Sequence, residues 1–304
     1  MVVSAPPFAR KQVLAAAGLI FLGSAGIQTS SAISSTLFAS YGTVGTSALR
    51  MAIAALVLLV VLCPSLRHRS RTEWAGIIVY GAAMAAMNIS LYVAIERLPL
   101  GIAVTLEFLG PCAVALMASR RIKEGACALL SLAGVALISA GPAGYFDLIG
   151  YLAGLSAALF FGLYTLFAAR VGKAGNGLDG LALSVSVAAI LTLPFAITRV
   201  PDVTAAHWGL LVLAAVVGVV IPYSVDTIAG RITSARIIGT LFAIDPAMGA
   251  LIGFVILGET ITVTALAGIL IVMLAGALLV WFSGSPTKLP SATETRDETS
   301  LDLA

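Results

Sequence analysis

Long apolar segments recur along the whole chain and constrain its fold more than any other feature. A transmembrane helix needs about 20 predominantly apolar residues, and ten such stretches follow one another with short connectors. Only helices and closed barrels satisfy their backbone groups in hydrocarbon, and segments of this length without strict alternation exclude barrel strands. We therefore predict an all-α integral membrane protein with ten transmembrane helices. The expected spans are 12–34, 44–63, 74–95, 99–119, 125–141, 147–169, 179–198, 207–229, 236–257 and 261–282.

The composition supports a lipid environment. Apolar residues make up 60% of the 304 residues and charged residues only 10%, whereas soluble domains average about a quarter charged residues. The net charge of +3 is scattered between apolar segments without a basic stripe, so we expect no nucleic-acid partner. Cys63, Cys112 and Cys127 lie in or beside apolar runs without a CxxC motif, as buried small hydrophobic residues do.

The distribution of Lys and Arg over the connectors predicts the orientation. Alternate connectors and the two ends collect 14 of the 17 basic residues, and the other connectors collect 3. The positive-inside rule then places both termini in the cytoplasm and requires an even number of spans. The start of the chain superficially resembles a signal peptide, but we interpret it as an uncleaved first span preceded by a cytoplasmic N-terminus, residues 1–11. Residues 284–304, rich in Ser, Thr, Pro and acidic residues, are expected to form a disordered cytoplasmic tail.

A weak internal match relates the two halves of the chain. Leu106 to Pro111 aligns with Leu241 to Pro246 at an offset of 135 residues, and Trp74 aligns with Trp208 at an offset of 134. Five spans per half is an odd number, so the second half enters the membrane from the opposite side. We predict two inverted five-helix repeats, residues 12–143 and 144–283, around a central cavity near the bilayer midplane.

Ionisable residues inside the spans are the main candidates for function, because a charge at mid-bilayer costs roughly 2.5–3.5 kcal/mol unless it faces a cavity or a partner. Glu107 lies about 12 Å into its helix, and Asp245 also lies near mid-depth. Each is closely followed by a proline, Pro111 or Pro246, which can bend a helix at a binding site. Arg50 either serves the same site or snorkels to the interface. Two further candidates near the end of the eighth span are Tyr223 and Asp226.

Polar residues at helical spacing define two more candidate faces. The first span carries Ser24, Gln28, Ser31 and Ser35, and the third carries Asn88 and Tyr92 four residues apart. Such a face lines water or substrate, or alternatively hydrogen-bonds to another helix. Small residues also recur at helical spacing and favour helix packing over ligand contact. They are Gly150, Gly154, Ala158, Gly162, Gly249 and Gly253.

Other patterns narrow the classes of function. The sequence lacks HExxH, GxSxG and Walker A motifs and has only 2 histidines, so we expect no enzyme, no metal site and no cofactor. Glu96, Asp147 and Glu259 lie at helix ends, where solvation explains them most simply. Few aromatic residues are expected in the cavity, namely Tyr92, Phe108, Tyr164 and Tyr223, which disfavours an aromatic cage for a cation.

The stretch Pro99 to Leu116 (PLGIAVTLEFLGPCAVAL) resembles the signature of the bacterial threonine/homoserine exporters of the EamA group, within the drug/metabolite transporter superfamily. The resemblance covers roughly residues 10–283 and implies ten helices in two inverted repeats, a central cavity and proton-coupled amino-acid efflux across a bacterial inner membrane. Two departures bear on the substrate, because those exporters carry glutamate where this chain has Asp226 and Asp245. Other matching pieces are Ala48–Arg50, Pro222–Ser224, Gly239–Leu241, Asp245–Ala247 and Leu257–Thr260.

The resulting hypothesis is a proton-coupled exporter of small neutral amino acids. Burial favours the neutral form of a carboxyl group, so Glu107, or secondly Asp245, could exchange a proton for the substrate ammonium. Arg50, Asn88 or a broken-helix N-terminus could meet the carboxylate. The alternatives are efflux of another metabolite or cationic drug and, from a different class, a non-transporting membrane scaffold. Membrane lipid surrounds the chain in each case. The sequence does not decide between a monomer and a homodimer.

Overall fold

The computed structural model describes residues 10–67, 69–117, 122–139, 147–173, 178–232 and 241–283. The expected N-terminal segment before residue 10, the tail 284–304 and the matching pair Gly239–Thr240 lie outside them. Every regular element in the described part of the chain is helical. The elements are α1 (Arg10–Ser35), α2 (Phe38–Leu62), α3 (Arg71–Ile95), α4 (Leu100–Met117), α5 (Ile122–Ser139), α6 (Leu148–Lys173), α7 (Leu178–Ile197), η2 (Val200–Asp202), α8 (Ala205–Ala215), η3 (Val216–Val220), α9 (Ile221–Ile232), η4 (Phe242–Ile244), α11 (Asp245–Ile252), η5 (Gly253–Leu257) and α12 (Val263–Ser283).

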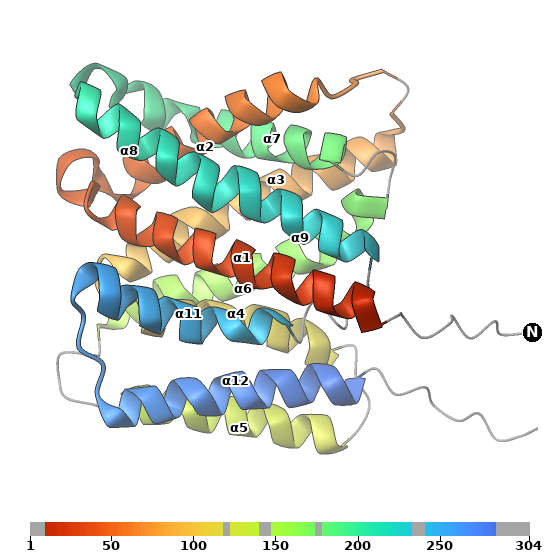
Figure 1. The fold of residues 1–304 in the computed structure, drawn as a ribbon, viewed down its shortest axis with the longest axis vertical. Helices are drawn as coiled ribbons and strands as arrows, with labels where there is room; N and C mark the ends of the chain where they lie inside the picture. The colour runs from red at the N-terminus through yellow and green to blue at the C-terminus, as the bar shows by residue number, and fades with distance from the viewer. Residues whose placement is uncertain are drawn as a thin grey trace, which may run out of the picture.

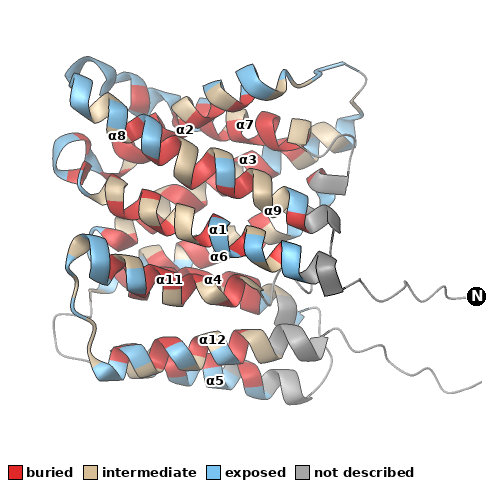
Figure 2. Ribbon diagram, in the orientation of Figure 1, coloured by how far each residue is buried: buried red, intermediate tan, exposed pale blue. Residues whose placement is uncertain are grey.

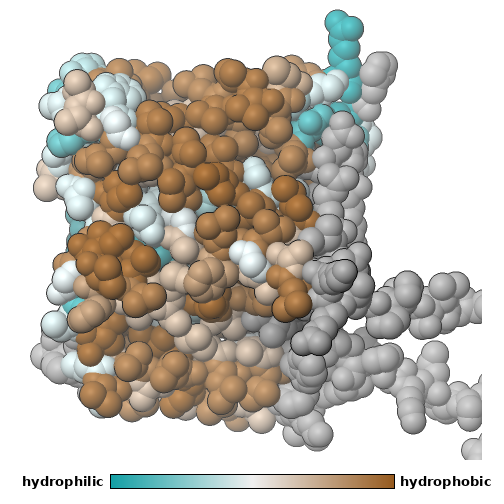
Figure 3. All heavy atoms as spheres, in the orientation of Figure 1, coloured by the Kyte–Doolittle hydropathy of each residue, from teal (hydrophilic) through white to brown (hydrophobic). Residues whose placement is uncertain are grey.

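Each expected apolar segment coincides with a helix or with a run of consecutive helical pieces, within a few residues at most boundaries. Six helical stretches in the described residues are long and apolar enough to cross a membrane, and four apolar ones are shorter, at 10–17 residues. Length and composition in the described residues therefore confirm six of the ten expected spans. Large apolar side chains cover the face of the molecule in Figure 3, and exposed residues such as Val60 (75%) and Val263 (83%) point outward. The chain is a multi-pass membrane protein.

With α8, η3 and α9 taken as one run, successive helices run in alternate directions, and the start of α1 and the end of α12 lie on the same face of the bundle (Figure 1). The pair α5 and α12 packs together at one edge, and α2 packs against α7 at the other. Between them, α3 packs on α6 and α1 packs on α9, while α4 contacts α6, α11 and α12. Burial is concentrated on the inward faces of these central helices (Figure 2).

Several helices are interrupted where the sequence places Gly or Pro. Gly42 has φ +70°, a left-handed conformation that glycine adopts without strain, and it kinks α2 near its start. Pro222 lacks an N–H, and the helix widens to the π-helical turn η3 directly before it. Pro246 occupies the first turn of α11, after the 3₁₀ turn η4. The described run from Phe242 to Leu257 consequently combines a 3₁₀, an α-helical and a π-helical piece.

Glycines allow α4 and α6 to approach closely. A Cβ added at Gly154 would lie 2.8 Å from the Leu106 side chain, and one at Gly162 would lie 3.2 Å from that of Val114. From the other side, a Cβ at Gly110 would overlap the carbonyl oxygen of Ala158. The small residues of α6 thus form a helix-packing surface, as the sequence predicts. This contact fixes the helix that carries Glu107.

Replacing Gly110 with alanine tests this packing. The added methyl group would overlap backbone atoms of α6, so we expect a loss of about 1–3 kcal/mol of stability. The matched control is Gly209→Ala in α8, where a Cβ meets nothing within 4 Å. Thermal unfolding in detergent should show a lowered midpoint for Gly110→Ala and an unchanged or slightly raised one for Gly209→Ala. Equal midpoints for the two variants would contradict the close contact.

Candidate functional site

A small central cavity brings together most of the residues that the sequence singled out. Its volume is about 40 Å³, and it lies among helices from both halves of the chain. Seven of the eight predicted site residues line it, and Tyr92 is the exception. The lining residues are Ile27, Gln28, Ser31, Arg50, Met87, Asn88, Leu91, Glu107, Phe161, Tyr164, Gly218, Tyr223, Asp226, Phe242 and Asp245.

Arg50 lies buried inside the bundle, with only 2% of its surface exposed. Its Nη1 donates to Ser30 Oγ at 3.0 Å, and its Nη2 donates to Asn88 Oδ1. The guanidinium carbon lies 4.6 Å from the centre of the Tyr92 ring. The snorkelling alternative is therefore wrong, because three polar or aromatic partners hold the head group in the protein interior.

Asn88 links Arg50 to the other side of the cavity. While its Oδ1 accepts from Arg50, its Nδ2 donates to the carbonyl of Met84 at 2.9 Å and to Tyr223 Oη at 3.1 Å. The amide can make all three contacts only in this orientation, because its oxygen accepts and its nitrogen donates. Asn88 and Tyr92, predicted as one polar face of α3, thus both contact Arg50.

Three carboxyl groups face the same cavity. Glu107 of α4 and Asp245 at the start of α11 are each 7% exposed, and Asp226 of α9 is half-buried. The described residues contain two salt bridges in all, neither of which involves these acids or Arg50. The cavity therefore holds three acidic groups against one fixed cation. Unless some of the acids are protonated, its charge favours a cationic group.

Some buried polar atoms at the site have no partner. Gln28 Oε1 and Arg50 Nε are inaccessible to solvent and make no hydrogen bond within the described residues. Native proteins satisfy most buried polar groups, so atoms of this kind around a cavity are candidates for binding a ligand. Gln28 and Ser31 of α1 face the cavity as predicted, whereas Ser35 bonds locally to the carbonyl of Ala32.

The aromatic lining differs from the expectation. Phe108 is wrong as a cavity residue, because it packs away from the cavity lining, against Cys112 and Gly276. Tyr164 and Tyr223 line the cavity as expected, and Phe161 and Phe242 take the places expected for Tyr92 and Phe108. The Phe161 and Tyr164 rings are 5.7 Å apart, and the Tyr164 and Tyr223 rings are 5.6 Å apart. The cavity therefore has four aromatic residues, as many as expected, but two of the four are different residues.

Known proteins resemble this chain along most of its length. The profile of the EamA-like transporter family matches residues 148–282. The threonine/homoserine exporter RhtA of Salmonella typhimurium strain LT2 is 32% identical over 272 residues, covering 86% of this chain and 91% of the relative. RhtA of Escherichia coli K12 is 32% identical over 249 residues, covering 80% and 84%. The chain belongs to the EamA-like transporter family.

A solved crystal structure of a protein adds independent support for the fold of this EamA-family chain. It aligns with a TM-score of 0.60 over 88% of this chain and 99% of its own, at 18% identity. At that identity the likeness shows the fold alone. Family membership makes the chain a transporter and not an enzyme. The described residues also contain no cluster of His, Cys, Asp or Glu suited to a metal ion.

The acids at the helix ends of this EamA-like transporter are not equally solvated. Glu96 is exposed, but Asp147 accepts from the Gly150 N–H at 2.6 Å and pairs with Arg97 at 3.4 Å. Glu259, in the connector before α12, accepts from the Leu100 N–H at 2.9 Å. Simple solvation is therefore wrong for Glu259. It caps α4 from the other half of the chain, where Pro99 offers no side-chain acceptor.

Substitution of Glu259 tests this long-range cap. Glu259→Ala should cost about 1 kcal/mol of stability, whereas Glu259→Gln keeps an oxygen that accepts from Leu100. Burial raises the pKa of Glu259 above its ordinary value of 4.5, and the hydrogen bond from Leu100 opposes that rise. The folded protein thus holds this proton more tightly than the unfolded chain.

Acidification from neutral pH towards 4.5 should therefore stabilise the native protein relative to Glu259→Gln, and alkalinisation should remove that gain. Unfolding midpoints of both proteins between these pH values isolate the effect, because their other groups are the same. A constant difference across the range would argue against the proposed environment of Glu259.

Proposed function

We propose that this transporter exports small neutral amino acids such as threonine and homoserine from the bacterial cytoplasm, in exchange for protons. The observation that carries the proposal is the cavity itself, in which buried Arg50 and the acids Glu107, Asp226 and Asp245 face one another. A zwitterion needs both of its charges met when it leaves water. Arg50 can bind its carboxylate, and an acid can bind its ammonium. The threonine/homoserine exporters among its relatives support this class of substrate.

The charge surplus supports proton coupling. Arg50 and one acid neutralise the bound zwitterion, which leaves two more carboxyl groups in a buried cavity. The ionised forms of these two carboxyl groups would repel each other. Protonation of one of them therefore favours the substrate-bound state or the state that returns without substrate. Exchange of a proton for the substrate ammonium at Glu107 or Asp245 then links export to the proton gradient.

The packing supports ten membrane-crossing helices in two inverted repeats, residues 12–143 and 144–283, in the inner membrane. Under this pairing α1 corresponds to α6, and α3 corresponds to the run α8 to α9. The contact of α3 with α6 then has its counterpart in that of α1 with α9. The contacts of α2 with α7, α4 with α11 and α5 with α12 each relate equivalent helices. A two-fold axis in the membrane plane would produce this pattern. The distribution of basic residues over the connectors supports a cytoplasmic position for both termini.

The size of the cavity supports an alternating-access cycle. A cavity of about 150 Å³ binds benzene, which has fewer heavy atoms than threonine, so a cavity of about 40 Å³ is too small for threonine. Towards the face opposite the basic connectors, α4 and α11 meet so closely that a Cβ at Gly101 would lie 2.7 Å from the Ala250 Cα. On the other side α1 meets α9 at Gly23 and Val225. Substrate therefore enters and leaves by separation of these helices.

Glu107→Gln tests the coupling role. The amide keeps the size of the side chain but cannot release a proton, so threonine efflux driven by an imposed pH gradient should fall at least about tenfold. Efflux of labelled threonine from vesicles measures it, with membrane content checked by immunoblot. The matched control is Glu96→Gln at an exposed helix end, which should export at the native rate. Undiminished gradient-driven efflux by Glu107→Gln would refute the assignment.

Arg50 as the carboxylate anchor makes a separate prediction. Hydrogen bonds to charged groups contribute about 1.5–3 kcal/mol, so Arg50→Gln should weaken threonine binding by roughly 10- to 150-fold. Threoninol, which lacks the carboxylate, should bind equally weakly to the native protein and to the variant. Competition with labelled threonine in vesicles measures both. If Arg50→Gln weakened both compounds to the same degree, its effect would be structural and the anchor assignment would fail.

The aromatic lining favours a second candidate, the efflux of an organic cation. Phe161, Tyr164, Tyr223 and Phe242 lie at the same cavity as three acids, and a cation is attracted both to aromatic faces and to carboxylates. Arg50 would oppose such a substrate by repulsion. Arg50→Gln should therefore increase the transport of a cation if this second candidate holds, whereas it should weaken amino-acid export under the leading proposal.

A further inference from the structure

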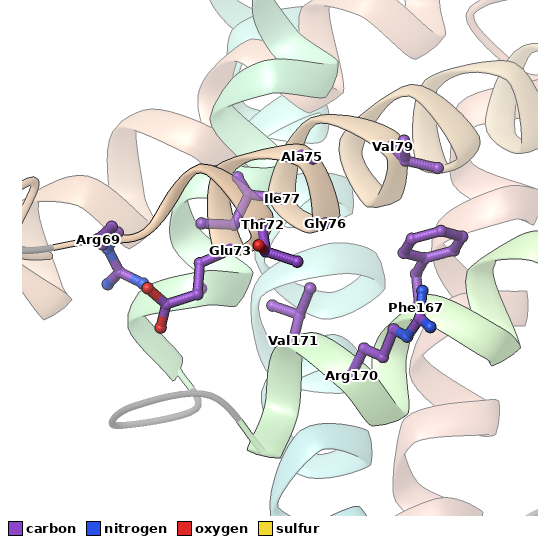
Figure 4. Close-up of a pocket in the computed structure, with 11 residues that line it drawn as sticks. Arg69, Thr72, Glu73, Ala75, Gly76, Ile77, Val79, Phe167, Arg170 and Val171 are labelled. Carbon is purple, nitrogen blue, oxygen red and sulfur yellow. The ribbon is translucent and has the colours of Figure 1, made fainter.

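A second, larger cleft lies between α3, α6 and the start of α7. Its volume is about 490 Å³, and it shares no lining residue with the central cavity. It lies at the end of the bundle where α1 begins (Figure 1). Figure 4 shows its two walls, with Thr72 to Val79 on α3 facing Phe167 to Val171 on α6. The lining is Arg69, Thr72, Glu73, Ala75, Gly76, Ile77, Val79, Phe167, Arg170, Val171 and Gly180.

Arg170 is the one cation at this cleft without a carboxylate partner among the described residues. Its guanidinium carbon lies 5.7 Å from the centre of the Phe167 ring, on the same helix. Arg69 pairs with Asp179 at 3.7 Å. Glu73 is engaged in the capping box of α3, where its carboxylate accepts from the Ser70 N–H at 2.7 Å. The acids of the cleft are thus occupied while Arg170 is not.

The surrounding connectors are strongly basic. The sequence stretches 65–73 and 170–180 contain five Lys and Arg residues and only two acidic residues, Glu73 and Asp179. An anion approaching the mouth of the cleft would therefore meet a net positive field. Basic pockets between transmembrane helices on the cytoplasmic side bind lipid head groups of this charge.

The walls of the cleft are apolar and continue onto the outer surface of the bundle. Val79 on one wall is 39% exposed, and its neighbour Ile78 is 50% exposed. Across the cleft Leu166, next to Phe167, is 51% exposed. A soluble anion would use the basic mouth but leave these apolar walls without a partner. An amphiphile with an anionic head and a hydrocarbon chain matches both parts.

We propose that this cleft binds an anionic glycerophospholipid, with the phosphate at Arg170 and an acyl chain along Val79 and Phe167. The lipid bridges α3 and α6, and both helices carry residues of the central cavity, such as Asn88 and Tyr164. Its binding stabilises the pair in the packed arrangement seen here. The lipid site does not involve the transported substrate, so it can be tested independently of the proposed export activity.

Native mass spectrometry of the full chain, purified in mild detergent and supplied with phosphatidylglycerol, tests the site. One lipid should remain bound per native chain. Arg170→Gln should weaken retention about fivefold, since one basic residue contributes about 1 kcal/mol to binding an anionic lipid. Arg97→Gln at the opposite face is the charge control and should retain lipid like the native protein. Equal retention by Arg170→Gln and the native chain would overturn the proposal.

A matched pair at Gly76 tests the apolar wall without altering charge. A Cβ at Gly76 would lie 3.8 Å from the Val171 side chain, an ordinary contact, so Gly76→Ala should retain lipid. Gly76→Leu should fill the cleft and release it. Phosphatidylcholine and inorganic phosphate serve as ligand controls, and the unfolding midpoint should rise with phosphatidylglycerol alone. An equal rise with phosphatidylcholine would refute an anionic site, and an equal rise with phosphate would show a soluble-anion site instead of a lipid site.

Discussion

The central part of this structure depends on the burial of Arg50. A guanidinium cannot lose its charge in a protein, so removing it from water requires partners for its donors and a counter-charge. Ser30 of α1, Asn88 of α3 and the ring of Tyr92 supply the contacts. Since each partner comes from a helix other than α2, the requirement ties three helices together at one depth.

One of the helix interruptions, the π-helical turn η3, lies directly beside Arg50. Gly218 lies in the π-helical turn η3, and a Cβ there would overlap Ser30 and lie 3.2 Å from Arg50 Nη1. Only a glycine leaves room for the hydrogen-bonded pair. On the other side of the cavity, the 3₁₀ turn η4 ends at Asp245, and Pro246 follows. Irregular backbone at membrane depth is tolerated where it lines a cavity, and here it brings the fixed cation and an acid to one cavity.

Much of this arrangement could be predicted from the sequence because it follows from the free-energy cost of placing charged groups in hydrocarbon. Charges such as Glu107 and Asp245 are expensive in hydrocarbon, so their depth alone indicated an interior site. Apolar periodicity does not give the direction of a side chain when a helix is apolar all round. The sequence therefore put Phe108 into the cavity and missed Phe161 and Phe242. A polar residue on such a helix carries more information, and both Gln28 and Asn88 were placed correctly at the cavity.

The contacts of Ser30 and Glu259 were not predicted, because the partners of these residues are distant in sequence. Ser30 bonds to Arg50 and to the carbonyl of Ala214, 184 residues away. Glu259 bonds to Leu100, 159 residues away. A local pattern cannot show such contacts. The lack of a capping side chain before Leu100 was a possible signal, because an uncapped helix start inside a packed bundle needs an acceptor from elsewhere.

The Glu259 contact also bears on how the cavity could open. It joins the connector after α11 to the first residue of α4, beside the close approach of Gly101 and Ala250. Any opening on this side must separate α4 from α11, and the cap of α4 then loses its acceptor unless the connector moves with it. Because Glu259 is half-buried and α4 carries Glu107, a rigid movement of α4 together with this connector keeps the cap. That movement changes the surroundings of Glu107 and leaves Arg50 fixed by α1 and α3. In the proposed transport cycle, the acid and not the arginine would thus be the group whose environment changes when this side opens.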